Sequence, residues 1–200
     1  SINHPVTDCV ACSWTHAVPP TVSAWEVFNG TAEGRRQALA MWDQLLRSGR
    51  RLTAVGESDW HRGTASIGAP VSRVWAAALS TPAILDAVKS GHVIVMSAGT
   101  LPTPDIVAHA GSESARVGDD LTVARDTPVS IDVTVDPAAY RGNRVDLIWR
   151  GETVARVPVP ADGKVSFERY PSEPGYFRVQ IGGADGAPRV IANPIFLRIR

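Results

Sequence analysis

The first half of the chain alternates short apolar runs with segments of helical periodicity. Residues 33–48 repeat apolar side chains at helical spacing, with Gly49 where the helix would end, and a second helix is expected from about Pro82 to Ser90. Strands that alternate with helices are typical of an α/β unit. The strands expected in this half are residues 24–28, 52–56 and 93–97, preceded by a strand end at residues 1–4.

The second half shows period-two alternation of apolar and polar residues and no helical stretch. Turn signals built on Gly, Asn and Asp separate these runs at intervals of about 8–12 residues. This spacing predicts an antiparallel β-sandwich, so we expect two domains, residues 1–96 and residues 97–200. The clearest alternating runs are Val129–Val135, Val145–Trp149 and Phe177–Ile181.

The charge balance excludes some classes of partner. Twenty Lys and Arg residues offset twenty Asp and Glu residues, which gives a formal net charge of zero. Nucleic acids and anionic membranes bind basic surfaces, so neither is expected as a partner. The longest apolar runs have about five residues, far fewer than the ~20 that cross a bilayer. Two cysteines cannot form a disulfide framework, so the cellular compartment stays open.

Polar side chains collect where the expected strands of the first half end. His4 follows the first of them, Glu26 and Asn29 belong to the second, and Asp59 and His61 follow the third. Chemistry in α/β proteins gathers at such strand ends, and imidazole and carboxylate groups are ligands of divalent metals. Asp59 and His61 lie two residues apart and can point the same way. The sequence therefore predicts a metal site built from His4, Asp59 and His61.

Less specific interpretations stay open for the neighbouring residues. Glu26 and Asn29 could face a substrate or make structural hydrogen bonds. Trp60 could pack against the apolar part of a substrate or cover the loop. Cys9 and Cys12 form a Cys-x-x-Cys spacing, but no second pair completes a zinc site, so ordinary thiols are the simpler interpretation.

Several ordered motifs resemble those of the PHP metallohydrolases, named for polymerase and histidinol phosphatase, and in particular their carbaryl-hydrolase-like branch. The similarity rests on Asn3-His4-Pro5, the stretch 26–30, the helix Ala38–Leu46, and Ala54–His61 with its Ser-Asp-x-His motif. Members of this branch also carry a C-terminal β-sandwich with an Asn-Pro-Ile segment, seen here within 192–196.

This resemblance implies a fold, an activity and a cofactor. The fold would be the C-terminal part of a distorted (β/α)7 barrel followed by an all-β sandwich. His4, Asp59 and His61 would bind divalent ions (zinc, manganese or iron), two or three in the complete enzyme, and Asp59 could also orient the attacking water. Metal-activated water would hydrolyse a small-molecule substrate, either a phosphoester or a carbamate or aryl ester.

The chain also departs from the family pattern. The early His-x-His pair, an acidic ligand and a further histidine of the family are absent, because the sequence starts at the Asn-His-Pro strand. We therefore expect the hydrolase to be incomplete as this chain alone, with an N-terminal barrel segment supplied in cis or as a separate chain. The alternative is a non-catalytic binding or scaffold protein built around the β-sandwich.

Overall fold

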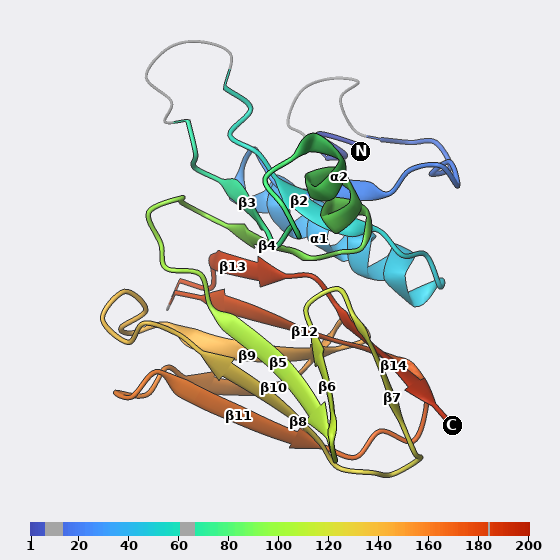
Figure 1. Cartoon of the computed structure of the whole chain (residues 1–200). Coiled ribbons are helices and arrows are strands. Elements are labelled where there is room, and N and C mark those ends of the chain that lie inside the picture. The colour runs from blue at the N-terminus through green and yellow to red at the C-terminus, as the bar shows by residue number, and fades with distance from the viewer. Residues whose placement is uncertain (7–13, 61–66, 184) are drawn as a thin grey trace.

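The structure of the chain is a computed structural model, which describes residues 1–6, 14–60, 67–183 and 185–200 (Figure 1). In these residues the helices are α1 (Ala32–Arg47) and α2 (Thr81–Lys89). The strands are β1 (Ala24–Phe28), β2 (Thr53–Gly56), β3 (Val71–Val74), β4 (Val93–Met96), β5 (Asp105–Ala110), β6 (Glu113–Arg116), β7 (Asp120–Val123), β8 (Val129–Thr134), β9 (Arg144–Trp149), β10 (Glu152–Pro158), β11 (Lys164–Arg169), β12 (Gly175–Gly182), β13 (Pro188–Ala192) and β14 (Ile195–Ile199).

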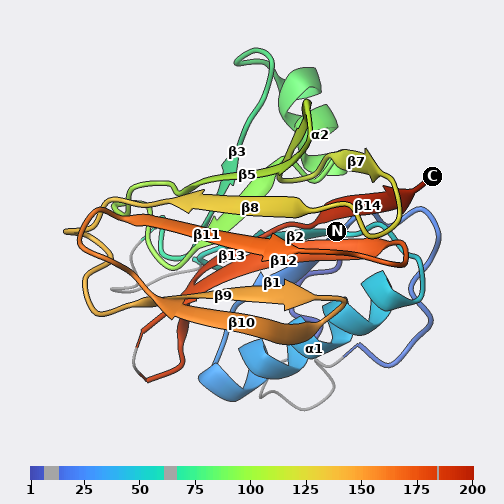
Figure 2. The same ribbon diagram turned by 90° about the horizontal axis from the view of Figure 1, so that it is seen from below.

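The second half forms two facing sheets, which confirms the strands that period-two alternation predicts. One sheet has the order β11-β8-β5-β6, and the other contains β10, β9, β12 and β13 (Figure 2). Alternate residues of β8, namely Val129, Ile131 and Val133, are fully buried in the core that the two sheets share. The burial of every second residue on one face is the pattern that the sequence shows.

The larger sheet continues from the second half of the chain into the first. Strand β13 pairs antiparallel with β4, and β4 pairs antiparallel with β3. Beside it, β1 and β2 form a small parallel sheet joined by α1, which packs against β1. The indole N–H of Trp25 donates to the Ala38 carbonyl and that of Trp42 donates to the Leu52 carbonyl, so both buried rings are fixed. The division of the chain into two domains, residues 1–96 and 97–200, stays a prediction.

The expected fold class of the first half is wrong. The described residues contain only two helices, and their sheets are open or packed face to face, so no (β/α)7 barrel segment is formed. The misleading feature is the apolar run Val93–Met96, which is buried at every position. Such a run fits a parallel barrel or the middle of an antiparallel sheet equally well. Here both neighbours of β4 run antiparallel to it.

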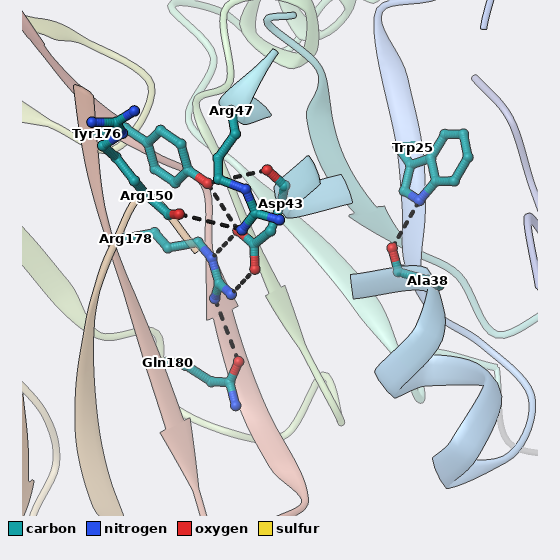
Figure 3. A network of polar contacts seen from close by, with 8 residues as sticks. All are labelled: Trp25, Ala38, Asp43, Arg47, Arg150, Tyr176, Arg178 and Gln180. Carbon is teal, nitrogen blue, oxygen red and sulfur yellow. Dashed lines mark hydrogen bonds and ion pairs between the residues drawn. The ribbon is translucent and has the colours of Figure 1, made fainter. Parts of the chain in front are cut away.

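A buried polar network joins α1 to the larger sheet (Figure 3). The guanidinium of Arg178 on β12 donates from Nε to Oδ1 of Asp43 at 2.9 Å and from Nη2 to Oδ2 at 2.5 Å. The hydroxyl of Tyr176 also donates to Oδ1, at 3.2 Å. Burial and the Asp43 carboxylate raise the pKa of Tyr176, so this hydroxyl stays protonated. The network thereby fixes the helix on which the β1–β2 unit rests.

Asn193 connects the small parallel sheet to β4. Its side-chain oxygen accepts from the Ala54 N–H at 2.7 Å, and its amide nitrogen donates to the carbonyls of Ala54 and Val93. Strands β2 and β4 therefore touch through a side chain rather than through a ladder of backbone hydrogen bonds. Gly56 permits this close approach, since an added Cβ would lie 2.4 Å from Val95 Cγ1. Neither described helix is long and apolar enough to cross a membrane.

Candidate metal site at the strand ends

Three segments run parallel and end at the same edge. Ile2 forms a parallel bridge with Trp25, and β1 pairs in parallel with β2. A backbone hydrogen bond runs from Ile2 N–H to the Ala24 carbonyl and another from Glu26 N–H to the Ile2 carbonyl. The residues that follow these segments therefore meet in one place. Four of the predicted site residues lie together there: His4, Glu26, Asn29 and Asp59.

The imidazole of His4 lies between the other three side chains. Its Nε2 is 3.3 Å from Oδ1 of Asp59. On its other side, Nδ1 is 3.1 Å from Oε2 of Glu26 and 2.6 Å from the amide nitrogen of Asn29. One ring nitrogen thus faces the half-exposed loop after β2, and the other faces the buried end of β1.

The backbone at both ends of this contact is unusual. His4 has φ 51° and Asp59 has φ 46°, which places both in the left-handed region. His and Asp adopt this region more readily than most residues, but it still costs free energy relative to an extended conformation. The His4 N–H donates to Oε2 of Glu26 at 2.7 Å and so supports the conformation at that position. Positive φ at two facing residues indicates that the loops are shaped for this contact.

Glu26 is a carboxyl group buried at the centre of the site, with 1% of its surface exposed. Burial raises its pKa above the ordinary value of 4.5, and the nearby Glu57 raises it further. Hydrogen bonds from the His4 backbone and the Asn29 side chain act in the opposite direction, as does the charge of His4. Its Oε1 atom has no hydrogen-bond partner among the described residues.

The distances test whether these residues suit the metal that the resemblance implies. Two ligand atoms bound about 2.1 Å from one ion are about 3.0–3.4 Å apart in octahedral or tetrahedral geometry. The 3.3 Å between His4 Nε2 and Asp59 Oδ1 lies in this range. A metal-binding imidazole usually donates its other N–H to a carboxylate, and Glu26 lies beside Nδ1 in that position. The described pair fits part of a metal site.

The described residues do not complete a metal-ligand set. No group of three His, Cys, Asp or Glu side chains suited to a metal occurs in the ranges given above. His61, the third predicted ligand, lies outside the described residues, as do Cys9 and Cys12. Trp60 is described and is 49% exposed, so it lies at the surface of the loop that carries Asp59. Its predicted contact with substrate stays a prediction.

The structure adds one residue that the sequence analysis did not single out. Glu57 directly follows β2 and lies close enough to raise the pKa of Glu26. Its position just beyond a buried strand is the signal that identified Asp59, and the same rule would have found it. Two other histidines pair elsewhere: His92 Nε2 lies 2.9 Å from Asp119, and His109 Nε2 lies 3.6 Å from Asp132.

The comparisons with known proteins leave the family open. No protein-family model and no curated protein matches the chain. Three solved structures of superoxide reductase (neelaredoxin) from Ignicoccus hospitalis, two of them of variants, show 20% sequence identity. The matches cover 48% of this chain and 80–81% of those chains, with TM-scores of 0.33–0.34. A likeness at that level supports no conclusion about fold or function.

Proposed function

We propose that the chain carries part of a divalent-metal site of a hydrolase of the PHP type. The observation that supports this most directly is the position of His4 between two carboxylates. Its Nε2 lies 3.3 Å from Asp59, and its Nδ1 lies 3.1 Å from the buried Glu26. Proteins orient a metal-binding histidine in this way: a carboxylate accepts the N–H of one ring nitrogen, and the other ring nitrogen binds the metal beside a second ligand.

The ligands in this proposal are His4 Nε2 and a carboxylate oxygen of Asp59, joined by His61. A divalent ion held there supplies an activated water molecule at neutral pH and polarises the bond to be hydrolysed. The mixed nitrogen and oxygen ligands suit zinc, manganese or iron. Phosphoesters and carbamate or aryl esters are the substrate classes that we propose, because such a site can hydrolyse both.

Glu26 and Asn29 determine which nitrogen of His4 carries the proton. When the Asn29 amide donates to Nδ1, the neutral ring must carry its proton on Nε2, where it points to Asp59. When Nδ1–H donates to Glu26 instead, the lone pair of Nε2 is available to an ion. Metal binding therefore requires the second tautomer, and the carboxylate of Glu26 stabilises it.

The proposal is tested by metal binding to the 200-residue chain. Zinc or manganese is titrated into the wild type and into an Asp59→Asn variant by isothermal titration calorimetry, and retained metal is then measured by elemental analysis. We expect at least one ion per chain in the wild type and a loss of about tenfold or more in affinity in the variant. An Asp86→Asn variant removes the same charge from helix α2 and serves as the control.

Two results would contradict the proposal. One is the absence of bound metal at millimolar concentrations in the wild type. The other is equal affinity in the wild type, Asp59→Asn and Asp86→Asn, which would place the ion elsewhere. Either result would favour the alternative of a non-catalytic binding or scaffold protein.

A further inference from the structure

A second candidate site lies between the β1–β2 unit and the loops of the sandwich. A hollow of about 480 Å³ opens there. Phe28 at the end of β1, Arg35 on α1 and Ser97 after β4 contribute from the first half of the chain. Arg141 and Arg189 contribute from the second half. We call this hollow, with its three arginines, the arginine pocket.

The charges around the arginine pocket are unbalanced. Three arginines line it, against a single acidic residue, Asp185. No Asp or Glu oxygen of the described residues lies within ion-pair distance of Arg35, Arg141 or Arg189. Some arginines elsewhere are paired with a carboxylate, as Arg178 is with Asp43. Like charges that gather around a hollow repel one another unless an anion neutralises them.

Contacts hold the side chains of Arg35 and Arg189, and the backbone of Arg141 is held by a hydrogen bond. The guanidinium of Arg35 lies 4.8 Å from the centre of the Phe28 ring. Arg189 donates from Nη1 to the Ala139 carbonyl at 3.4 Å. The carbonyl of Arg141 accepts a hydrogen bond from the side chain of Asn143, which fixes the turn before β9. Side chains or backbone held in this way lose less conformational entropy when a ligand binds.

We propose that the arginine pocket binds a small organic phosphate. Guanidinium groups match phosphate oxygens with paired hydrogen bonds. The charge of three guanidinium groups suits a doubly charged phosphate ligand better than a singly charged carboxylate ligand. The volume is in the range of small-molecule sites and exceeds what a free phosphate ion would fill. Ala187 and Pro188 provide apolar surface for the organic part. The site needs no metal, and two of its three arginines come from the second half of the chain.

Phenyl phosphate is a suitable probe because it combines a doubly charged phosphate with an aromatic ring. It is titrated into the 200-residue chain by isothermal titration calorimetry at low ionic strength, with a chelator present so that no metal contributes. We expect saturable binding to the wild type, with benzoate bound at least about tenfold more weakly. Phenol, which lacks the anionic group, is expected to give no saturable binding.

Substitution of the arginines locates the site. We expect the Arg141→Gln/Arg189→Gln variant to bind phenyl phosphate at least about tenfold more weakly than the wild type. The Arg36→Gln/Arg125→Gln variant loses the same charge at exposed positions outside the pocket and should stay within about twofold of the wild type. Thermal unfolding of both variants shows whether each one is folded under the conditions of the titration.

Three outcomes would overturn the proposal. They are the absence of binding by phenyl phosphate at millimolar concentration, an equal loss of affinity in both double variants, and binding of phenol as tight as that of phenyl phosphate. The metal site and the arginine pocket fail independently, because the first is tested with metal alone and the second in the presence of a chelator.

Discussion

Two carboxylates are buried in the first half of the chain, and their surroundings differ. Asp43 receives hydrogen bonds from the guanidinium of Arg178 and from the hydroxyl of Tyr176 (Figure 3). Glu26 is buried more deeply and, among the described residues, forms no ion pair with an arginine or lysine, while one of its oxygens has no hydrogen-bond partner there. A buried charge that is fully paired serves the fold, whereas one left partly unsatisfied indicates a functional site.

The comparison also separates two ways of positioning an element. The Asp43–Arg178 pair fixes α1 against β12 with two hydrogen bonds between rigid partners. Around Glu26 the contacts come from His4 and Asn29, and the imidazole can exchange one hydrogen bond for another. The hydrogen bonds around Asp43 have a single arrangement, whereas those around Glu26 have two, one for each tautomer of His4. We therefore expect substitutions at the two carboxylates to affect different properties of the protein.

Asp43→Ala should have the largest effect on stability. It leaves the guanidinium of Arg178, whose side chain is 3% exposed, buried without its partner. Breaking a buried pair in this way costs about 3–5 kcal/mol in the free energy of unfolding. Urea denaturation followed by circular dichroism measures the change. Arg116→Gln breaks an exposed pair with Asp105 and should cost less than about 1 kcal/mol. Similar losses in the two variants would refute the structural role of Asp43.

Glu26→Gln should affect metal binding more than stability. The amide keeps the shape of the carboxyl group but holds His4 Nδ1–H less strongly than a carboxylate does. Loss of a carboxylate behind a metal-binding histidine typically lowers metal affinity by about 10–100-fold. Calorimetric titration with zinc tests this expectation. Unchanged affinity, in a variant that unfolds at the wild-type temperature, would show that Glu26 does not orient a ligand.

The same variant should change how stability depends on pH. The pKa of Glu26 is raised in the folded protein, so between its ordinary value of 4.5 and its folded value the native state binds more protons than the unfolded state. Stability should therefore fall as the pH rises above about 4.5, and this component of the slope should disappear in Glu26→Gln. Thermal unfolding across that pH range measures it. An identical slope in the two proteins would contradict the assignment.

Asp120 should give a smaller effect of opposite sign. Hydrogen bonds from Arg51 and Arg198 lower its pKa from 3.8 to about 2. The ionised Asp120 carboxylate contributes fully to the stability of the fold above its unfolded pKa of about 3.8, and this contribution is lost as the pH falls from there towards 2. In an Asp120→Asn variant the loss of stability in acid should be shallower than in the wild type. A steeper loss would mean that the pairs with Arg51 and Arg198 do not stabilise the fold.

The sequence predicted the local elements better than their assembly. Periodicity located α1, α2 and the alternating strands, because one buried face leaves a repeating pattern. It did not show that Val93–Met96 has antiparallel neighbours, since a strand buried on both faces has no pattern to indicate its partners. The contact between His4 and Asp59 could be predicted, because each residue follows an expected strand and such strand ends lie together. The arginine pocket could not be predicted in this way, because its three arginines are about 50 to 150 residues apart in the sequence and lie on unrelated elements.

The hydrogen bonds of Asn193 have a consequence for the order of events during synthesis. Its amide is bonded to Ala54, 139 positions earlier in the chain, and to Val93, 100 positions earlier. While residues 54 and 93 leave the ribosome, the group that joins their strands has not yet been made. Contacts between such distant residues form late, after the intervening chain is available. The end of β2, which leads to Asp59, can therefore be joined to β4 in this way only after residue 193 has been synthesised.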